Sequence, residues 1–272
     1  MSETLFFGTL FFVLGAVIGS FLNVCIVRWP EEKSVVKPRS HCPNCKKMIA
    51  WYDNIPFLSY ILLGGKCRHC KIKFSFRYFL VELITALTFL AFYFYFGLNI
   101  LLLPYLIMVC GFIVATFVDL KHRIIPDEVS VGGMFVGLAL SLLIPQMHGI
   151  DPSVGNFWIN HLQSLGLSAL GVLIGGGSIY LMGMLGDFLF KKESMGGGDV
   201  KLMAMVGAFL GWIPAILAFF IAPFFGMLYG IIGWLRTRDS TMAYGPFLVL
   251  GSLIAMFWGN VIVRWFAAQY GY

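Results

Sequence analysis

Two aspartates beside long apolar segments are the first candidates for chemistry. Asp119 ends one apolar run, and Asp199 follows the glycines at 196–198 and opens another. Ionisable residues at such places are costly and mark functional sites. Two carboxylates in one site cannot both ionise, so one keeps a proton and polarises a carbonyl group while the other activates water. The pair predicts aspartic-protease chemistry; the alternative is two ordinary interfacial residues, with Asp199 capping the following helix.

Four cysteines form two C-x2-C pairs whose spacing favours a metal site. The pairs are Cys42/Cys45 and Cys67/Cys70, and 21 residues separate them. Each turn presents two sulfurs to one ion, so two turns suit tetrahedral zinc. Four sulfur ligands leave no open coordination position, and the zinc is therefore predicted to be structural. Two redox-active dithiol pairs are the alternative.

Two further polar residues lie deep in apolar runs. Asn23 is in the first run and Glu82 is in the second. They are expected either to form hydrogen bonds between helices or to line a second active site. Cys25 and Cys110 also lie in apolar runs, where cysteine behaves as a small core residue.

The composition identifies a membrane protein. Of the 272 residues, 59% are hydrophobic and 12% are charged, whereas soluble domains have about 25% charged residues. The net charge of +6 could suggest a nucleic-acid partner. However, the basic residues lie in one loop and at the ends of apolar runs, with no basic, aromatic-rich groove, so no nucleic acid is expected and the partner is the lipid bilayer.

The apolar residues fall into about eight runs that can cross a bilayer, which takes about 20 residues of helix. The first run is predicted to be a retained span, because it lacks a basic leader and a small-residue cleavage site. The sixth run is short. The predicted spans are 5–27, 79–97, 100–119, 129–145, 163–186, 201–213, 214–235 and 246–268.

The distribution of lysine and arginine predicts the orientation. Of 19 such residues, 11 lie between Arg28 and Arg77. With this loop in the cytoplasm, the inside loops 120–128, 187–200 and 236–245 all contain lysine or arginine, and the outside loops 98–99, 146–162 and 213–214 contain none. Only Arg264 departs from the positive-inside rule. Both termini are thus expected outside, and both aspartates at the cytoplasmic rim.

These patterns together predict an all-α polytopic membrane protein with a small cytoplasmic zinc-binding loop domain. Residues 1–78 would contain the first span and the cysteine loop. Residues 79–272 would form the transmembrane peptidase core. This division follows the chemistry expected of each part.

Several motifs, in this order, resemble those of the type IV prepilin (leader) peptidases, which share a GxGD motif with presenilin-like aspartic proteases. The resemblance covers nearly the whole chain, and the order of the motifs makes it specific. The motifs are Gly19-Ser20-Phe21-Leu22-Asn23-Val24, Arg28-Trp29-Pro30, the paired cysteines with Asn54-Ile55-Pro56 and Gly65-Lys66-Cys67, Arg77-Tyr78 with Glu82, Asp119-Leu120-Lys121, Ile124-Ile125-Pro126-Asp127 and Gly196-Gly197-Gly198-Asp199-Val200-Lys201.

The resemblance implies a bifunctional enzyme of the bacterial inner membrane. Such an enzyme cuts the leader from type IV prepilins or type II secretion pseudopilins after a glycine, and then methylates the new N-terminal residue with S-adenosylmethionine. Asp119 and Asp199 match the catalytic aspartates of the family, and the four cysteines match its metal ligands. For methyl transfer, Gly65, Lys66, Asn23 and Glu82 are the candidate residues.

Other functions stay open at this stage. A protease-only relative would lack methylation. A secondary transporter could use the two aspartates as a proton or cation relay around a broken helix, but it would place them near the bilayer midplane and would not explain the cysteine loop. A metal-sensing or scaffold protein of a secretion apparatus would use that loop as its functional part.

Overall fold

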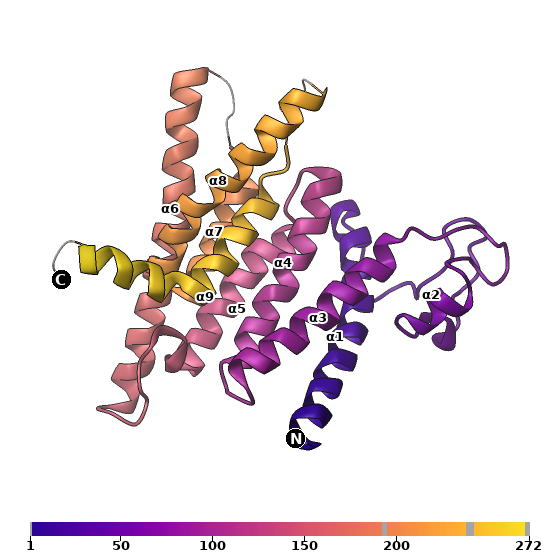
Figure 1. Cartoon of the computed structure of the whole chain (residues 1–272), viewed down its shortest axis with the longest axis horizontal. Coiled ribbons are helices and arrows are strands. Elements are labelled where there is room, and N and C mark those ends of the chain that lie inside the picture. Colours follow the sequence, from indigo (N-terminus) through magenta and orange to yellow (C-terminus); the bar gives the residue numbers. More distant parts are fainter. Residues whose placement is uncertain (1, 192–194, 238–241, 270–272) are drawn as a thin grey trace. The chain divides into compact units, whose positions relative to one another are not determined.

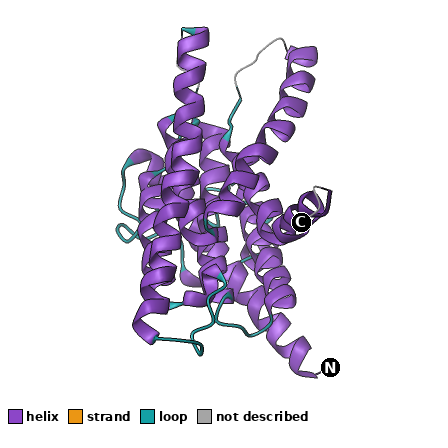
Figure 2. Cartoon of the chain, turned by 90° about the vertical axis from the view of Figure 1, so that its left-hand side faces the viewer, coloured by secondary structure: helices purple, strands orange, loops and turns teal. Residues whose placement is uncertain are grey.

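The computed structural model describes residues 2–191, 195–237 and 242–269, and within them the regular secondary structure is helical, without a β-strand (Figure 2). The predicted all-α fold class is therefore confirmed. The helices are α1 (Ser2–Arg28), η1 (Trp29–Glu31), η2 (Trp51–Asn54), α2 (Leu58–Leu62), α3 (Arg77–Phe96), α4 (Leu102–His122), α5 (Asp127–Leu143), η3 (Pro145–His148), α6 (Phe157–Phe190), α7 (Gly197–Leu210), α8 (Trp212–Thr237) and α9 (Gly245–Gln269).

Each of the eight predicted spans overlaps a different helix. In the described part of the chain, only six of these eight helices are long and apolar enough for a membrane span. The six are α1, α3, α4, α6, α8 and α9. Helix α5 has 17 residues and α7 has 14, which is short of the roughly 20 residues that cross a bilayer. The chain is a multi-pass membrane protein, whereas the exact count of eight spans is not confirmed.

The chain divides into two compact units, Met1–Val114 and Ala115–Tyr272, and α4 runs through the division. Helix α3 belongs to the first unit because it packs along α1. The predicted division into 1–78 and 79–272 concerns the function of each part, and it stays a prediction.

In the N-terminal unit, glycines bring α1 and α3 into close contact (Figure 1). A methyl group added at Gly15 would lie 2.8 Å from the Ala86 Cα, and one at Gly19 would lie 2.8 Å from the Glu82 Cα. Nearer the N-terminus, the rings of Phe11 and Tyr93 stack with centroids 5.1 Å apart. The close approach fixes the polar residues of these two helices beside one another.

In the C-terminal unit, α7 lies along α6 at a glycine contact, and α8 packs beside α9 (Figure 1). A methyl group at Gly171 of α6 would lie 2.1 Å from the Gly207 carbonyl oxygen of α7. Small residues that let two backbones touch in this way drive helix association in membranes. On α9, a methyl group at Gly251 would lie 2.8 Å from the Ala218 carbonyl oxygen of α8. The α6–α7 contact holds in place the helix that carries Asp199.

Candidate active site and candidate metal centre

Asp119 lies in the last turn of α4 and is buried, with 6% of its surface exposed. Helix α4 ends when the Arg123 amide donates to the Asp119 carbonyl oxygen over 2.8 Å and Arg123 takes a left-handed conformation, with φ 56°. The C-terminal end of a helix disfavours an anion, because the backbone carbonyl dipoles point their negative ends there. Here the Gly245 amide, in the first turn of α9, donates to Asp119 Oδ2 over 2.8 Å, and the charge of Arg123 also acts on the carboxylate.

Asp199 is the third residue of α7, which begins at Gly197. The residue before the helix is Gly196, and no side chain caps this end. Asp199 is therefore not the N-cap residue of α7, which was the alternative to a catalytic role. Its amide donates to the Gly196 carbonyl oxygen over 3.1 Å, and the Gly196 amide donates to its carboxylate. In the first turn of a helix, the backbone dipoles favour a carboxylate.

One buried side chain, Ile125, links the surroundings of the two aspartates. A methyl group at Gly198, next to Asp199, would lie 3.2 Å from Ile125 Cβ, and one at Gly245 would lie 3.3 Å from Ile125 Cδ1. Ile125 itself is 8% exposed. Any larger residue at position 198 or 245 would push Ile125 aside, so the glycines allow the ends of α4, α7 and α9 to approach one another.

The two aspartates also act on each other electrostatically. Asp199 precedes the predicted span 201–213, and its pKa is raised to about 7, first by burial and then by the negative charge of Asp119. The pKa of Tyr244 is raised to about 12, by burial and then by the charge of Asp199. Both carboxylates accept a backbone amide, from Gly245 at Asp119 and from Gly196 at Asp199, but Asp119 also has a nearby arginine and is the better place for the negative charge. The arrangement can hold one proton on Asp199 and one charge on Asp119.

Sequence reasoning missed Gly245 and Tyr244 as residues of this site. Both residues lie more than 120 positions from Asp119 in the sequence. Gly245 acts through its backbone amide, which the pattern of side chains does not reveal. The Gly-Pro pair at 245–246 is the available signal, since it marks the start of a helix on the same predicted face as both aspartates. Asp127 and Lys201, which belong to the same motifs, form an exposed ion pair of 2.7 Å between α5 and α7.

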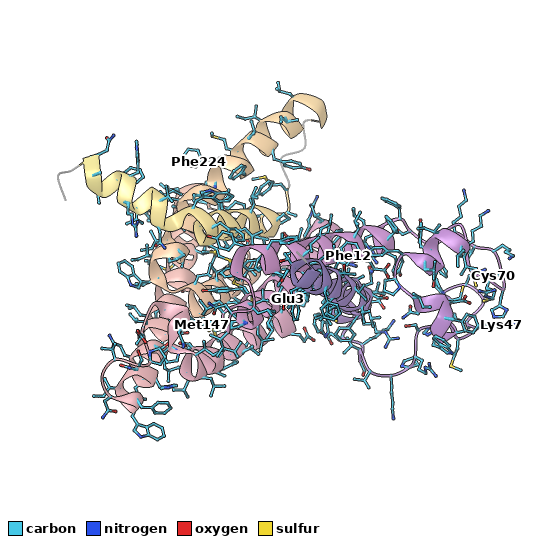
Figure 3. The ribbon with its side chains drawn as sticks, turned by 60° about the horizontal axis from the view of Figure 1, so that its bottom comes forward. Glu3, Phe12, Lys47, Cys70, Met147 and Phe224 are labelled. Atoms are coloured by element: carbon cyan, nitrogen blue, oxygen red, sulfur yellow. The ribbon has the colours of Figure 1, made fainter. Side chains whose placement is uncertain are left out.

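The four predicted metal ligands come together in the cysteine loop, residues 29–76, where Figure 3 shows Cys70 and Lys47. The two C-x2-C segments fold in the same way. The Lys46 amide donates to the Cys42 carbonyl oxygen and the Lys71 amide to that of Cys67, each over 3.0 Å. Lys46 and Lys71 are both left-handed, with φ 57° and 60°. The same turn occurs twice, and each one directs two sulfurs to a common point.

The sulfur positions fit one tetrahedral ion. All four Sγ atoms lie within 4.8 Å of one another, with Cys42 to Cys70 at 3.6 Å and Cys45 to Cys67 at 4.0 Å. A tetrahedron with bonds of about 2.3 Å to zinc has sulfurs about 3.8 Å apart. The cysteines are free thiols rather than disulfides. The chain thus has a four-cysteine cluster that could hold a metal ion.

An ion pair ties this cluster to the preceding turn. Arg68, between Cys67 and Cys70, donates from Nε and a terminal nitrogen to both oxygens of Asp53 in η2. This contact lowers the pKa of Asp53. Such bidentate geometry is specific as well as strong, and it fixes the second cysteine turn against η2.

The four residues predicted for methyl transfer all line one cavity of about 500 Å³ in the N-terminal unit. Asn23 comes from α1, Glu82 from α3, and Gly65 and Lys66 from the turn after α2. Glu82 Oε2 accepts the Phe57 amide over 3.0 Å. Gly65 has a φ of 64°, and a methyl group there would lie 2.8 Å from the Tyr60 ring. Both therefore shape the cavity wall as well as line it.

The fold and these sites define a class: a polytopic helical membrane protein with one buried and one half-buried carboxylate in the same site of one unit, and a four-cysteine cluster beside a cavity in the other. Comparison with known proteins narrows the class. Residues 13–96 match the model of the bacterial peptidase A24 N-terminal domain, and residues 106–231 match that of the type IV leader peptidase family. The chain belongs to the type IV leader peptidase family.

Curated relatives agree along most of the chain. A prepilin leader peptidase/N-methyltransferase of Myxococcus xanthus is 41% identical, over 68% of this chain and 58% of the relative. One of Legionella pneumophila is 32% identical, over 92% of this chain and 90% of the relative. A type 4 prepilin-like proteins leader peptide-processing enzyme of Escherichia coli is 32% identical, over 89% and 91%. No solved structure gives a significant match.

Proposed function

We propose that this chain cuts the leader peptide from type IV prepilins or pseudopilins after a glycine, and then methylates the new N-terminal residue with S-adenosylmethionine. One observation carries the peptidase half: two aspartates, one buried (Asp119) and one half-buried (Asp199), are 80 residues apart in sequence and lie in one site where the charge of one acts on the other. The printed names of the relatives supply the substrate class and the second reaction.

The surroundings of the aspartates assign their roles. Asp119, held by the Gly245 amide, is the charged partner that accepts a proton from the attacking water. Asp199, whose pKa is about 7, is the protonated partner that donates a hydrogen bond and then its proton to the carbonyl oxygen. The water oxygen bonds to the carbonyl carbon and gives a tetrahedral diol. The carbon–nitrogen bond then breaks, the leaving amine takes the proton held by Asp119, and one hydroxyl of the diol returns its proton to Asp199 as the carbonyl group re-forms.

Conservative substitutions test this proposal. Asp119→Asn and Asp199→Asn keep the shape of each side chain and remove its acid–base function. We expect each variant to enter the membrane but to leave a prepilin uncut, as weighed by mass spectrometry after incubation with the full-length protein. Asp127→Asn is the control, since Asp127 belongs to the same motif but is exposed and paired with Lys201. Processing by both single aspartate variants would disprove the mechanism.

The position of the aspartates at helix ends supports a peptidase over an ion relay. Asp199 is in the first turn of α7, and Asp119 is in the last turn of α4, whose 21 residues are long enough to cross a bilayer. Asp119 therefore lies near the membrane surface, whereas a transporter places its ion site near the midplane. With the basic loops inside, we infer that both aspartates and the cysteine loop face the cytoplasm of a bacterial inner membrane. There they would meet the leader of a prepilin before export.

The metal is proposed to be zinc, with a structural role. The sulfur distances fit tetrahedral zinc, as described above, and the four thiolates would fill its coordination shell. An ion there would fold the cysteine loop by joining its two turns, since binding to a site absent in the unfolded chain is folding free energy. It would have no open position for substrate.

The cavity lined by Asn23, Glu82, Gly65 and Lys66 is proposed as the site of the methyl donor. Its size is within the range of about 300–1,000 Å³ of small-molecule sites, and its buried wall offers oxygen acceptors to a cationic ligand. When bound, S-adenosylmethionine supplies a methyl group whose bond to sulfur breaks as a bond to the amine nitrogen forms, while the electron pair stays on sulfur and the amine releases a proton. The chain's own part is to bind and orient both molecules and to exclude water.

A further inference from the structure

The cavity of the N-terminal unit separates its charges by depth. Among its lining side chains, Asn23 and Glu82 are buried, with 3% and 9% exposed. Lys33, Lys46 and Lys66 line the same cavity and are exposed, whereas Arg28 is half-buried and donates to the carbonyl oxygens of Ser34 and Pro38. Buried oxygen acceptors therefore lie inside, and the lysine charges lie at the rim.

Asn23 has the clearest mark of a ligand-binding group. Its Nδ2 donates to the Tyr78 carbonyl oxygen over 2.9 Å. Its Oδ1 is buried and has no hydrogen-bond partner in the described structure. A buried acceptor without a donor has lost its water and gained no partner, and native proteins keep few of them. A ligand with a positively polarised group would satisfy it.

Glu82 adds a negative charge to the same wall. Two other carboxylates line the cavity, and both are in ion pairs: Asp53 with Arg68, and Glu31 with Lys33. The partners of Glu82 are neutral: the Phe57 amide and the hydroxyl of Ser20. Within the described part of the chain, no lysine or arginine pairs with Glu82. Its charge is available to a ligand.

Aromatic rings complete this end of the cavity. Tyr60, Phe74, Tyr78 and Phe79 also line it, and ring faces attract cations, most strongly where water is excluded. We propose that Asn23, Glu82 and these rings form a cation subsite that distinguishes a positively charged sulfonium donor from its neutral thioether product. The subsite rests on the proposed methyl-donor site, and its consequence is product release: transfer of the methyl group removes the charge that held the ligand.

Binding measurements test the subsite without relying on turnover. The full-length protein in nanodiscs would be titrated calorimetrically with S-adenosylmethionine, with S-adenosylhomocysteine, which is neutral at sulfur, and with sinefungin, which carries an amine there. We expect S-adenosylmethionine and sinefungin, which are positively charged at the sulfur position, to bind at least about tenfold more tightly than S-adenosylhomocysteine, which is neutral there. A desolvated contact to a cation is worth about that factor. Equal affinity for all three would overturn the subsite and leave the donor site standing. No binding of any probe would overturn the donor site itself.

Variants then locate the selectivity. Glu82→Gln should weaken binding of the charged probes about tenfold and leave the neutral probe within about twofold, whereas Glu82→Asp should keep the preference. Glu31→Gln is the control, because Glu31 lines the same cavity but is exposed and paired. If Glu82→Gln does not fold, Asn23→Leu removes the buried acceptor and should lower the preference in the same direction. An unchanged preference in the folded variant would refute the proposal.

Discussion

The contact between Gly245 and Asp119 gives the most direct test of the active-site geometry. In Gly245→Ala, the new methyl group would lie 2.8 Å from Asp119 Oδ2 and 3.3 Å from its Cγ. Ordinary van der Waals contact begins at 3.4 Å, so the carboxylate must move by about 0.6 Å, and the hydrogen bond from the Gly245 amide is lost or bent.

The size of the effect follows from that hydrogen bond. A hydrogen bond to a charged group contributes about 1.5–3 kcal/mol. If the bond is needed to keep Asp119 charged and aimed at water, losing it raises the barrier by this amount. At about 1.36 kcal/mol for each factor of ten in rate, kcat/KM for prepilin cleavage should fall about 13- to 160-fold. The acidic limb of its pH profile should also move to higher pH, because the anion has lost a donor.

Gly251→Ala is the matched control, because it adds the same methyl group to the same helix at the same distance. That methyl group would lie 2.8 Å from the Ala218 carbonyl oxygen, where there is no carboxylate. We expect this variant to lower the melting temperature while keeping the pH profile of cleavage, and both variants to retain methyl transfer to a pilin that is already cut. Equal loss of cleavage in both variants, without a pH shift, would show that packing alone explains the contact.

Three further predictions concern charge, metal and packing. Because the pKa of Asp199 is about 7, its protonated form is present below that pH and lost above it; cleavage should decline about tenfold per pH unit above 7, and a flat profile to pH 9 would contradict the assigned roles. Cys67→Ser should release the bound zinc, measured by mass spectrometry of the metal, and should speed proteolysis within residues 30–78. Cys25→Ser, the control, should do neither. Unchanged zinc content in Cys67→Ser would reject the four-sulfur site. Gly171→Ala should destabilise the C-terminal unit by about 1–3 kcal/mol or more in a denaturation assay, because its methyl group meets the α7 backbone at 2.1 Å, while Gly177→Ala on the same helix meets nothing within 4 Å and should not; equal stability of the two would argue against the α6–α7 contact.

Whether a feature of this protein can be predicted from its sequence depends on whether side chains or backbone atoms form it. The cysteine cluster was predictable because side chains of one type at a fixed spacing specify it. The aspartates stood out because ionisable residues beside apolar runs are costly. The contact of Gly245 with Asp119 was not predictable, since it uses a backbone amide across 126 positions.

A helix boundary was predicted wrongly where a capping side chain sets the start of the helix. The fifth span was predicted to begin at residue 163, after the polar residues Asn160 and His161. Helix α6 begins at Phe157 instead, because the Asn156 side chain accepts the Trp158 amide over 3.0 Å and caps the helix. Asn160 is then buried inside the helix and donates to the carbonyl oxygens of Asp151 and Val154, so its polarity did not signal a loop.

Three helix ends explain why the two aspartates can differ in charge. A carboxylate in the last turn of α4 faces the unfavourable end of that helix, while one in the first turn of α7 faces a favourable end; taken alone, this would make Asp199 the charged partner. Each carboxylate accepts a backbone amide, Asp119 that of Gly245 and Asp199 that of Gly196. The order is reversed because the charge of Arg123 also acts on Asp119, whereas burial and the charge of Asp119 outweigh the Gly196 amide at Asp199. Removing either support from Asp119 should therefore do more than weaken it. The single proton of the pair would be shared more evenly between the two aspartates, and an enzyme that needs one acid and one base would lose the distinction.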